Sequence, residues 1–354
     1  MDIPAPSQLL DRVRALPAGR ALLERIGDRE AVFLVGGAVR DLVLGREPLE
    51  LDLLVEGDAG GLARVVGGTV IAHDRFGTCK VRFEGHSYDI ATARTETYPA
   101  AGALPTVEPA TLREDLSRRD FTVNAIAMPL GGARAGTLEA LPGALEDLAA
   151  RALRVLHDQS FVDDPTRLLR LCRYAGRLRF SIEPHTHELA LAAARSGALD
   201  TVSGARVGAE LRLLAAEPDP LASFAVAREL GLDRALHPRF GLGDPALARD
   251  ALDLLPADGR GDLLVLAAAS EEVPQAELRR LLDRLAFRAA HRERIVAAAA
   301  GARPLSQALQ RARTPAQIAA AASDASPELI ALAGAHGGAD RAAAWLEKLR
   351  HVRL

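Results

Sequence analysis

Two carboxylates, Glu50 and Asp52, stand two residues apart at the beginning of an apolar run that continues to residue 55. Alternate residues of a β-strand point to the same face of a sheet, so this spacing lets both side chains share one divalent cation. Carboxylate oxygens are the donors that Mg²⁺ prefers in proteins. The pair therefore predicts a metal site, although an isolated pair of this kind is more often solvated surface.

A candidate anion site precedes these carboxylates. Gly36 and Gly37 end an apolar run, and a helix-like stretch that carries Arg40 and Asp41 follows. Glycine has no Cβ, so its backbone N–H groups can approach an anion closely, and the start of a helix adds free N–H groups and a positive dipole end. A lone glycine pair is usually a turn, but a glycine pair followed by a basic helix and paired carboxylates predicts a site for a nucleoside triphosphate and Mg²⁺.

A second polar cluster, Arg118, Arg119 and Asp120, comes shortly before an apolar segment at 125–130. Two guanidinium groups and a carboxylate can hold a triphosphate or the hydroxyls of a ribose. The alternative is an ordinary basic turn in which Asp120 caps a helix.

Asp164 and Arg167 lie three residues apart at the start of a helix-like segment, where Pro165 suits the first turn. Their side chains therefore share one helix face. Cytosine and adenine both present an amine donor beside a ring-nitrogen acceptor, which a carboxylate and a guanidinium match, whereas uracil and guanine present the reverse order. The pair can thus select C and A, or it can be a surface ion pair.

The composition limits the protein class. The chain of 354 residues is long enough for two or three domains, and its low aromatic content of 4% beside abundant Ala and Leu favours helices. A net charge of −3 excludes a uniformly basic nucleic-acid binder, so RNA contacts must come from local patches. The two cysteines lack metal-ligand spacing. Without a signal peptide or an apolar run of about 20 residues, we expect a cytoplasmic protein.

The pattern of apolar residues divides the chain into an α/β part and a helical part. We expect strands at 31–35, 51–55, 78–84, 87–92 and 125–130, helices at 37–44, 59–66 and 111–117, and a loop at 94–110. From about residue 144 the helical period continues to the end, with Pro304 separating helices at 287–300 and 305–312.

Three segments carry a resemblance to a known family. Residues 34–55, LVGGAVRDLVLGREPLELDLLV, and residues 118–128, RRDFTVNAIAM, resemble the signatures of the class II tRNA nucleotidyltransferase and bacterial poly(A) polymerase family. The string DDPTR at 163–167 resembles the protein template of that family, usually Glu-Asp-x-x-Arg. The resemblance implies a polymerase-β-type α+β head with a small mixed sheet (1–135), a helical neck with the template helix (136–215), and a helical body and tail that bind RNA (216–354).

The resemblance also implies roles for individual residues. Glu50 and Asp52 would be the metal ligands, and Asp89 would be a third catalytic carboxylate unless it is a surface residue at a strand edge. Asp164 and Arg167 would recognise the base. The remaining residues expected to bind the nucleotide are Gly36, Gly37, Arg40, Asp41, Arg118, Arg119, Asp120, Asp163, Arg170 and Arg173.

Two further segments resemble parts of the family that need not touch the nucleotide. Residues 73–78 lie where the family carries a flexible loop that acts in nucleotide switching. Arg206 and Glu210, four residues apart, resemble a later helix, where they would pair and brace the template helix from behind.

The activity implied is addition or repair of the 3′-terminal CCA of tRNA, with CTP and ATP as substrates, two Mg²⁺ ions as cofactors and the acceptor arm as partner. Alternatives within the family are partial addition of CC or A, and poly(A) synthesis. Glu50 departs from the aspartate that is most common at its position, and Mg²⁺ tolerates little geometric error. A catalytically impaired RNA-binding homologue is therefore a further alternative.

Overall fold

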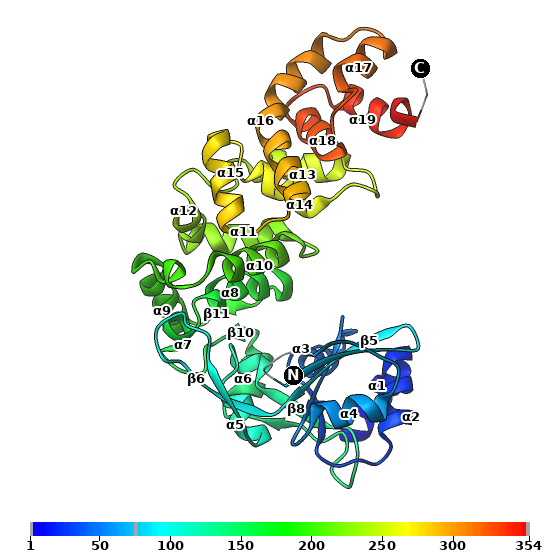
Figure 1. Ribbon diagram of the computed structural model, residues 1–354, viewed down its shortest axis with the longest axis vertical. Coiled ribbons are helices and arrows are strands. Elements are labelled where there is room, and N and C mark those ends of the chain that lie inside the picture. The colour runs from blue at the N-terminus through cyan, green and yellow to red at the C-terminus, as the bar shows by residue number, and fades with distance from the viewer. Residues whose placement is uncertain (1–2, 74–76, 352–354) are drawn as a thin grey trace. The chain divides into compact units, whose positions relative to one another are not determined.

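The computed structural model describes residues 3–73 and 77–351, and the chain forms two compact units. Unit 1 comprises residues 1–163 and 181–187 and contains a mixed sheet, whereas unit 2 comprises 164–180 and 188–354 and is helical (Figure 1). The predicted fold class, an α+β head followed by a helical remainder, is confirmed. The predicted domain limits at 135 and 215 stay predictions, although the compact unit that holds the head extends to Asp163.

The centre of unit 1 is a seven-stranded sheet with the strand order β3-β4-β5-β2-β1-β8-β9. Its strands are β1 (Val32–Val35), β2 (Leu51–Val55), β3 (Thr69–His73), β4 (Thr78–Phe83), β5 (His86–Thr92), β8 (Ile126–Pro129) and β9 (Glu139–Ala140). Only β2 and β5 pair in parallel, and the other neighbours are antiparallel. The strand β3 was not predicted.

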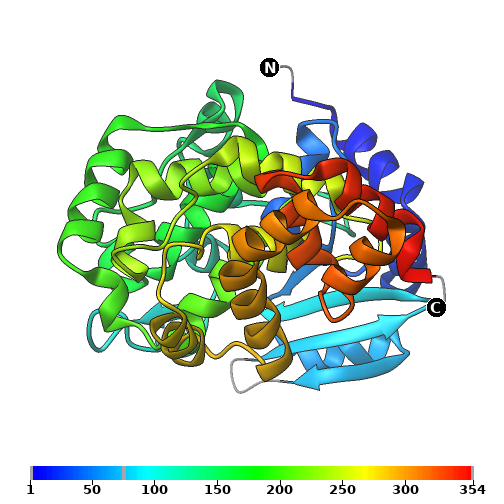
Figure 2. The same cartoon turned by 90° about the horizontal axis from the view of Figure 1, so that it is seen from above.

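Helices cover the sheet and begin where capping residues permit. They are α1 (Pro6–Ala15), α2 (Pro17–Ile26), α3 (Gly37–Val43), α4 (Ala59–Val66) and α5 (Leu112–Ser117). The Asp58 side chain accepts from the N–H of Gly60 and caps α4, which packs against β2, β4 and β5 (Figure 2). On α5, Leu112 and Leu116 join a core cluster with Phe33 and Leu54 of the sheet. This packing holds β1, β2 and the segment before β8 together.

The predicted loop at 94–110 is wrong in part, because it contains a two-stranded hairpin of β6 (Arg94–Thr97) and β7 (Thr106–Pro109). Its Thr, Pro and Gly content is typical of loops. Contacts outside the hairpin stabilise its strands: Glu96 of β6 forms an ion pair with Arg118, and the backbone N–H of Arg94 donates to Asp115 of α5. These partners lie far along the chain, so local sequence does not reveal them.

Short elements complete unit 1 after the sheet. They are the 3₁₀ turn η1 (Thr122–Asn124), α6 (Ala144–Ala150), β10 (Ala152–Leu153), α7 (Ser160–Asp163) and β11 (Ser181–Ile182), which pairs in parallel with β10. The buried Asp147 of α6 accepts from the hydroxyl of Thr122 and from the guanidinium of Arg154. The segment that follows the sheet is therefore bonded to the turn that carries Asn124.

Unit 2 consists of helices around an Ala- and Leu-rich core. They are α8 (Thr166–Leu178), α9 (Pro184–Arg195, which begins in unit 1), η2 (Ala198–Thr201), α10 (Gly204–Ala215), α11 (Pro220–Glu229), α12 (Leu232–Leu236), α13 (Pro245–Leu254), α14 (Gly261–Ala268), α15 (Gln275–Arg284), α16 (Ala289–Arg311), α17 (Pro315–Ala322), α18 (Pro327–His336), α19 (Ala339–Glu347) and η3 (Leu349–His351).

The predicted helix break at Pro304 is wrong, because Pro304 lies inside α16. Proline removes one hydrogen bond and usually kinks or ends a helix. Here the buried residues Ala302 and Leu305 flank it, and α16 packs along α18 and α14. Tertiary packing therefore outweighs the local cost. Within the described part of the chain, no helix is long and apolar enough to cross a membrane.

Candidate functional site

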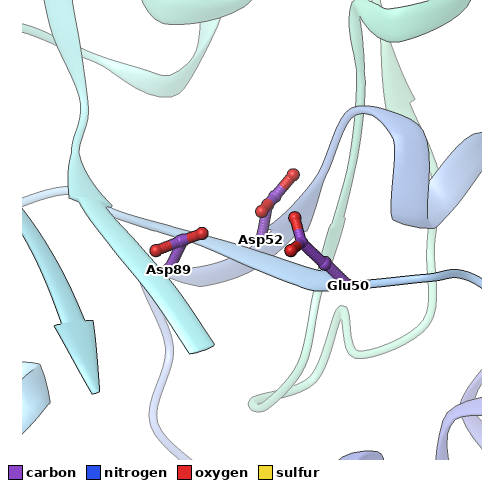
Figure 3. A group of neighbouring side chains, drawn as sticks. All are labelled: Glu50, Asp52 and Asp89. Carbon is purple, nitrogen blue, oxygen red and sulfur yellow. The ribbon is translucent and has the colours of Figure 1, made fainter. Parts of the chain in front are cut away.

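Adjacent strands of unit 1 bring three carboxylates together. Asp52 on β2 and Asp89 on β5 are direct register partners of the parallel pair, and Glu50 lies immediately before β2 (Figure 3). One oxygen atom from each residue lies within 4.8 Å of the others. The structure thus brings Asp89, the uncertain third carboxylate of the sequence analysis, to the predicted pair.

The three negative charges affect one another. Burial raises the pKa of Asp52 to about 6, and the nearby Asp89 and Glu50 carboxylates add to the rise. Arg119 and Lys80 act in the opposite direction on this pKa. Lys80 on β4 donates from Nζ to Oδ2 of Asp89 over 3.0 Å. Without a further cation, Asp52 therefore resists full ionisation near pH 6.

This donor set fits a divalent metal ion. Mg²⁺ and related hard cations take carboxylate oxygens at about 2 Å, so oxygens separated by a few ångströms can share one ion. Like charges that raise a pKa when crowded are also the charges that a divalent cation stabilises most. Glu50 is exposed and longer than aspartate, which lets its carboxylate reach the group from just outside the strand.

The glycine turn before α3 lies against an arginine of the second cluster. Gly36 has φ of +66°, a conformation that side-chain-bearing residues rarely adopt. A Cβ placed on Gly36 would lie 2.7 Å from Nη1 of Arg119. Nη2 of Arg119 pairs with Asp115, whereas its buried Nε has no hydrogen-bond partner among the described residues. An unsatisfied N–H donor beside this turn suits an anionic or hydroxyl-bearing ligand.

Arg40, in contrast, is held inside unit 1. Arg40 is 1% exposed, and its guanidinium donates to Asp41 Oδ1 over 2.9 Å and to Asn124 Oδ1 over 2.6 Å. Asn124 Nδ2 donates in turn to Asp120 Oδ1 over 3.0 Å. This chain of bonds links the first signature to the second and favours a role for Arg40 and Asp41 in fixing the glycine turn.

Arg118 is also engaged by protein carboxylates. It pairs with Glu96 over 2.6 Å and with Asp115, which is fully buried and also holds Arg119. The sequence analysis missed Asp115, which lies on α5, three residues before Arg118 and four residues before Arg119. The structure therefore separates the pair: Arg118 anchors the β6–β7 hairpin, and Arg119 lies beside Gly36.

The predicted base-recognising residues lie in unit 2. Oδ1 of Asp164 accepts from the backbone N–H and the hydroxyl of Thr166, and it pairs with Arg206 over 2.8 Å. Among the described residues, these contacts of the Asp164 side chain all use Oδ1. Arg167 is buried, with 5% of its surface exposed. The contacts of Oδ1 fix the orientation of the Asp164 carboxylate.

Further along α8, the arginines pair with glutamates. Arg173 is buried and bonds Glu210 over 2.6 Å and Glu217 over 3.1 Å, and Arg170 lies 3.5 Å from Glu210. Both guanidinium groups lie near the ring of Tyr174. Arg206 and Glu210 thus both contact the segment that contains the template residues, as a bracing role requires, but they do so through Asp164 and through Arg170 and Arg173 instead of pairing with each other.

Two other predicted positions are less informative. Asp163 ends α7 and is partly exposed, in unit 1. Of the segment at 73–78 that was expected to be a flexible loop, Asp74, Arg75 and Phe76 lie outside the described residues.

The sequence was compared with known proteins. Residues 32–154 match the family model for the poly A polymerase head domain. The A-adding tRNA nucleotidyltransferase of Geobacter sulfurreducens is 42% identical over 240 residues, which are 66% of this chain and 27% of that protein. The CC-adding tRNA nucleotidyltransferase of Deinococcus radiodurans is 40% identical over 204 residues, which are 56% of this chain and 54% of that protein. The chain thus matches about a quarter to about half of the length of these relatives.

Solved structures match over much more of the chain. A CCA-adding enzyme in an apo form superposes with a TM-score of 0.83 at 30% identity, covering 100% of this chain and 88% of the other. The Thermotoga maritima CCA-adding enzyme complexed with tRNA superposes with a TM-score of 0.76 at 29% identity, again covering 100% and 88%. The signatures, the three neighbouring carboxylates and the structural similarity over the whole of this chain together show that it belongs to the class II CCA-adding tRNA nucleotidyltransferase family.

Proposed function

We propose that the protein transfers CMP and AMP from CTP and ATP to the 3′ end of tRNA, to add or repair the terminal CCA. The observation that carries this proposal is the group of Glu50, Asp52 and Asp89, whose oxygens converge on adjacent strands. In the reaction, the 3′-hydroxyl of the RNA loses its proton and bonds to the α-phosphorus, and the bond from that phosphorus to pyrophosphate breaks.

The carboxylates, the glycine turn and the arginines of unit 1 each have a role in this transfer. Glu50, Asp52 and Asp89 would hold Mg²⁺, which lowers the pKa of the attacking hydroxyl and stabilises the charge of the leaving pyrophosphate. The backbone at Gly36 and Gly37 and the guanidinium of Arg119 would bind the triphosphate or the ribose. Arg40, Asn124 and Asp120 keep that turn in place through their buried hydrogen bonds.

Base selection is assigned to unit 2. Oδ2 of Asp164 would accept from the exocyclic amine of C or A, and Arg167 would donate to the ring nitrogen. The contacts of Oδ1 with Thr166 and Arg206 fix the orientation of this carboxylate in advance. Helices beyond α10 would contact the acceptor arm of tRNA, chiefly through phosphates and shape. A cytoplasmic location follows from this substrate and stays a prediction.

Partial addition is the second candidate. The A-adding and CC-adding relatives of G. sulfurreducens and D. radiodurans are 42% and 40% identical to this chain, whereas a multifunctional CCA protein of Ralstonia nicotianae is 34% identical. An A-adding enzyme would accept only tRNA that ends in CC, and a CC-adding enzyme would stop before the terminal A.

Primer choice separates these activities. The protein would be incubated with Mg²⁺, labelled CTP or ATP, and tRNA ending at the discriminator base, at C or at CC. Incorporation of both nucleotides that stops after CCA supports the complete activity. Incorporation of A alone or of CC alone supports a partial enzyme, and long A tails support poly(A) synthesis. No incorporation into any primer would reject the enzymatic proposal and favour an RNA-binding homologue.

A further inference from the structure

A lysine lies beside the three carboxylates. The sequence contains only two lysines, Lys80 and Lys348. Lys80 is the register partner of Asp89 across β4 and β5, and Asp89 is the register partner of Asp52 across β5 and β2. Residues that are direct partners on neighbouring strands have side chains on the same face, so the ammonium group and the carboxylates share one side of the sheet.

The contact of Lys80 uses one oxygen of a carboxylate that a metal ion would need. Nζ lies 3.0 Å from Oδ2 of Asp89, and the two side chains are 39% and 33% exposed. A partly exposed ion pair of this kind is weak and exchanges with solvent ions. Its location matters more than its strength, because Asp89 belongs to the group whose oxygens lie within 4.8 Å of one another.

We propose that Lys80 is the internal counter-ion of this group: it pairs with Asp89 while no divalent cation is bound and releases this carboxylate when one binds. Three carboxylates this close repel one another, and a single ammonium offsets part of the repulsion. A divalent cation attracts the same oxygens with twice the charge and repels the ammonium. The four-carbon stem of lysine lets Nζ move into solvent without a change in the strand.

The consequence is that Lys80 weakens metal binding in the nucleotide-free protein. It competes for Asp89, and its charge repels the incoming cation. A residue that only orients Asp89 would have the opposite effect, because its loss would disorder a ligand. The sign of the change in metal affinity therefore distinguishes a counter-ion from a purely structural lysine.

The test is a titration of nucleotide-free protein with Mn²⁺, with free Mn²⁺ measured by electron paramagnetic resonance. For Lys80→Met we expect affinity for Mn²⁺ about fivefold tighter than in the wild type, because the partly exposed ion pair that is lost is weak. Lys80→Arg keeps the charge and should stay within about twofold. Lys348→Met is the matched control, since it removes the same charge from an exposed residue in unit 2, and it should leave the affinity unchanged.

A double variant locates the effect. In the Asp89→Asn background, where the metal ligand and the ion pair are both lost, Lys80→Met should tighten binding by a smaller factor than in the wild type. Unchanged or weaker Mn²⁺ binding by Lys80→Met would overturn the inference. Should that variant unfold in EDTA at a lower temperature than the wild type, Lys80→Gln replaces it and must give the same sign.

The inference depends on the metal site of the proposed function but not on nucleotide transfer. A protein that binds Mn²⁺ with the expected changes and adds no nucleotide to any primer would contradict the proposed function alone. A protein that adds nucleotides but binds Mn²⁺ no more tightly after Lys80→Met would contradict the counter-ion alone.

Discussion

Replacing Arg40 with methionine tests whether this arginine fixes the glycine turn or binds phosphate. The change removes the donors to Asp41 and to Asn124 and leaves the Asn124 oxygen unpaired in a residue that is 5% exposed. Loss of one partner from a buried charged network costs about 3 to 5 kcal/mol. A substrate-binding arginine on the surface would instead affect the nucleotide-free protein very little.

The free-energy change should appear where the network lies. The single tryptophan, Trp345, is in unit 2, so its fluorescence does not report on this region. Hydrogen exchange followed by mass spectrometry on peptides that cover β1, α3 and β2 does. We expect amide exchange in α3 to be at least about 100-fold faster in Arg40→Met, since each tenfold change corresponds to about 1.4 kcal/mol.

A matched control is available in the same unit. Arg14 pairs with Asp11 on the surface, with side chains that are 59% and 71% exposed, so Arg14→Met should cost less than about 1 kcal/mol. Exchange in α3 of Arg40→Met that equals the wild type, together with a raised KM for the nucleotide, would refute the structural role and restore the phosphate contact.

Four further predictions concern the residues proposed to bind the metal ion and the nucleotide. Asp52 has a pKa of about 6, above its ordinary 3.8, so the affinity of the protein for Mn²⁺ should fall as the pH falls below 6. In metal-free protein, the contribution of Asp52 to stability is present below about pH 4 and is lost as the pH rises through 6. An affinity for Mn²⁺ that does not change between pH 5 and 7 would contradict this. Asp89→Asn removes a like charge and should move that transition to lower pH. Gly36→Ala places a Cβ 2.7 Å from Arg119 Nη1 at a φ of +66°, so urea unfolding should show a loss of about 1 to 3 kcal/mol, and no loss would argue against the turn geometry. Asp164→Ala should relax the choice of C and A over U and G in primer extension more than it weakens tRNA binding, and unchanged selectivity would remove its assignment to the base.

The candidate metal ligands Glu50 and Asp52 were easier to predict than the residues that lie beside them on neighbouring strands. Glu50 and Asp52 could be paired from the two-residue period of a strand, which depends only on local backbone geometry. The proximity of Asp89 depends on β2 and β5 pairing in parallel, a contact between distant segments that a single sequence does not show. Lys80 was overlooked for the same reason, because it reaches the carboxylates only across β4 and β5.

The roles of the arginines also depend on contacts between distant segments that a single sequence does not show. In sequence, Arg40, Arg118, Arg119 and Arg173 look equally suited to phosphate. The structure distinguishes them by their carboxylate partners: Arg173 meets two glutamates, Arg118 meets Glu96 and Asp115, and Arg119 keeps an unsatisfied Nε. Composition shows how many positive charges a chain carries, but only tertiary packing decides which of them remain available to a ligand.

The carboxylates of Asp52 on β2 and Asp89 on β5 are proposed to catalyse nucleotide addition to tRNA. The most direct test of this role is the single-turnover rate of labelled CMP or AMP incorporation into tRNA primers with Mg²⁺, for the wild type, Asp52→Asn and the control Asp58→Asn. Asp58 is an exposed helix cap that asparagine can replace, so the control should match the wild type. We predict incorporation by the wild type and a loss of at least about 1,000-fold for Asp52→Asn, as expected when a metal ligand is removed. Equal rates for Asp52→Asn and the wild type would contradict this catalytic role.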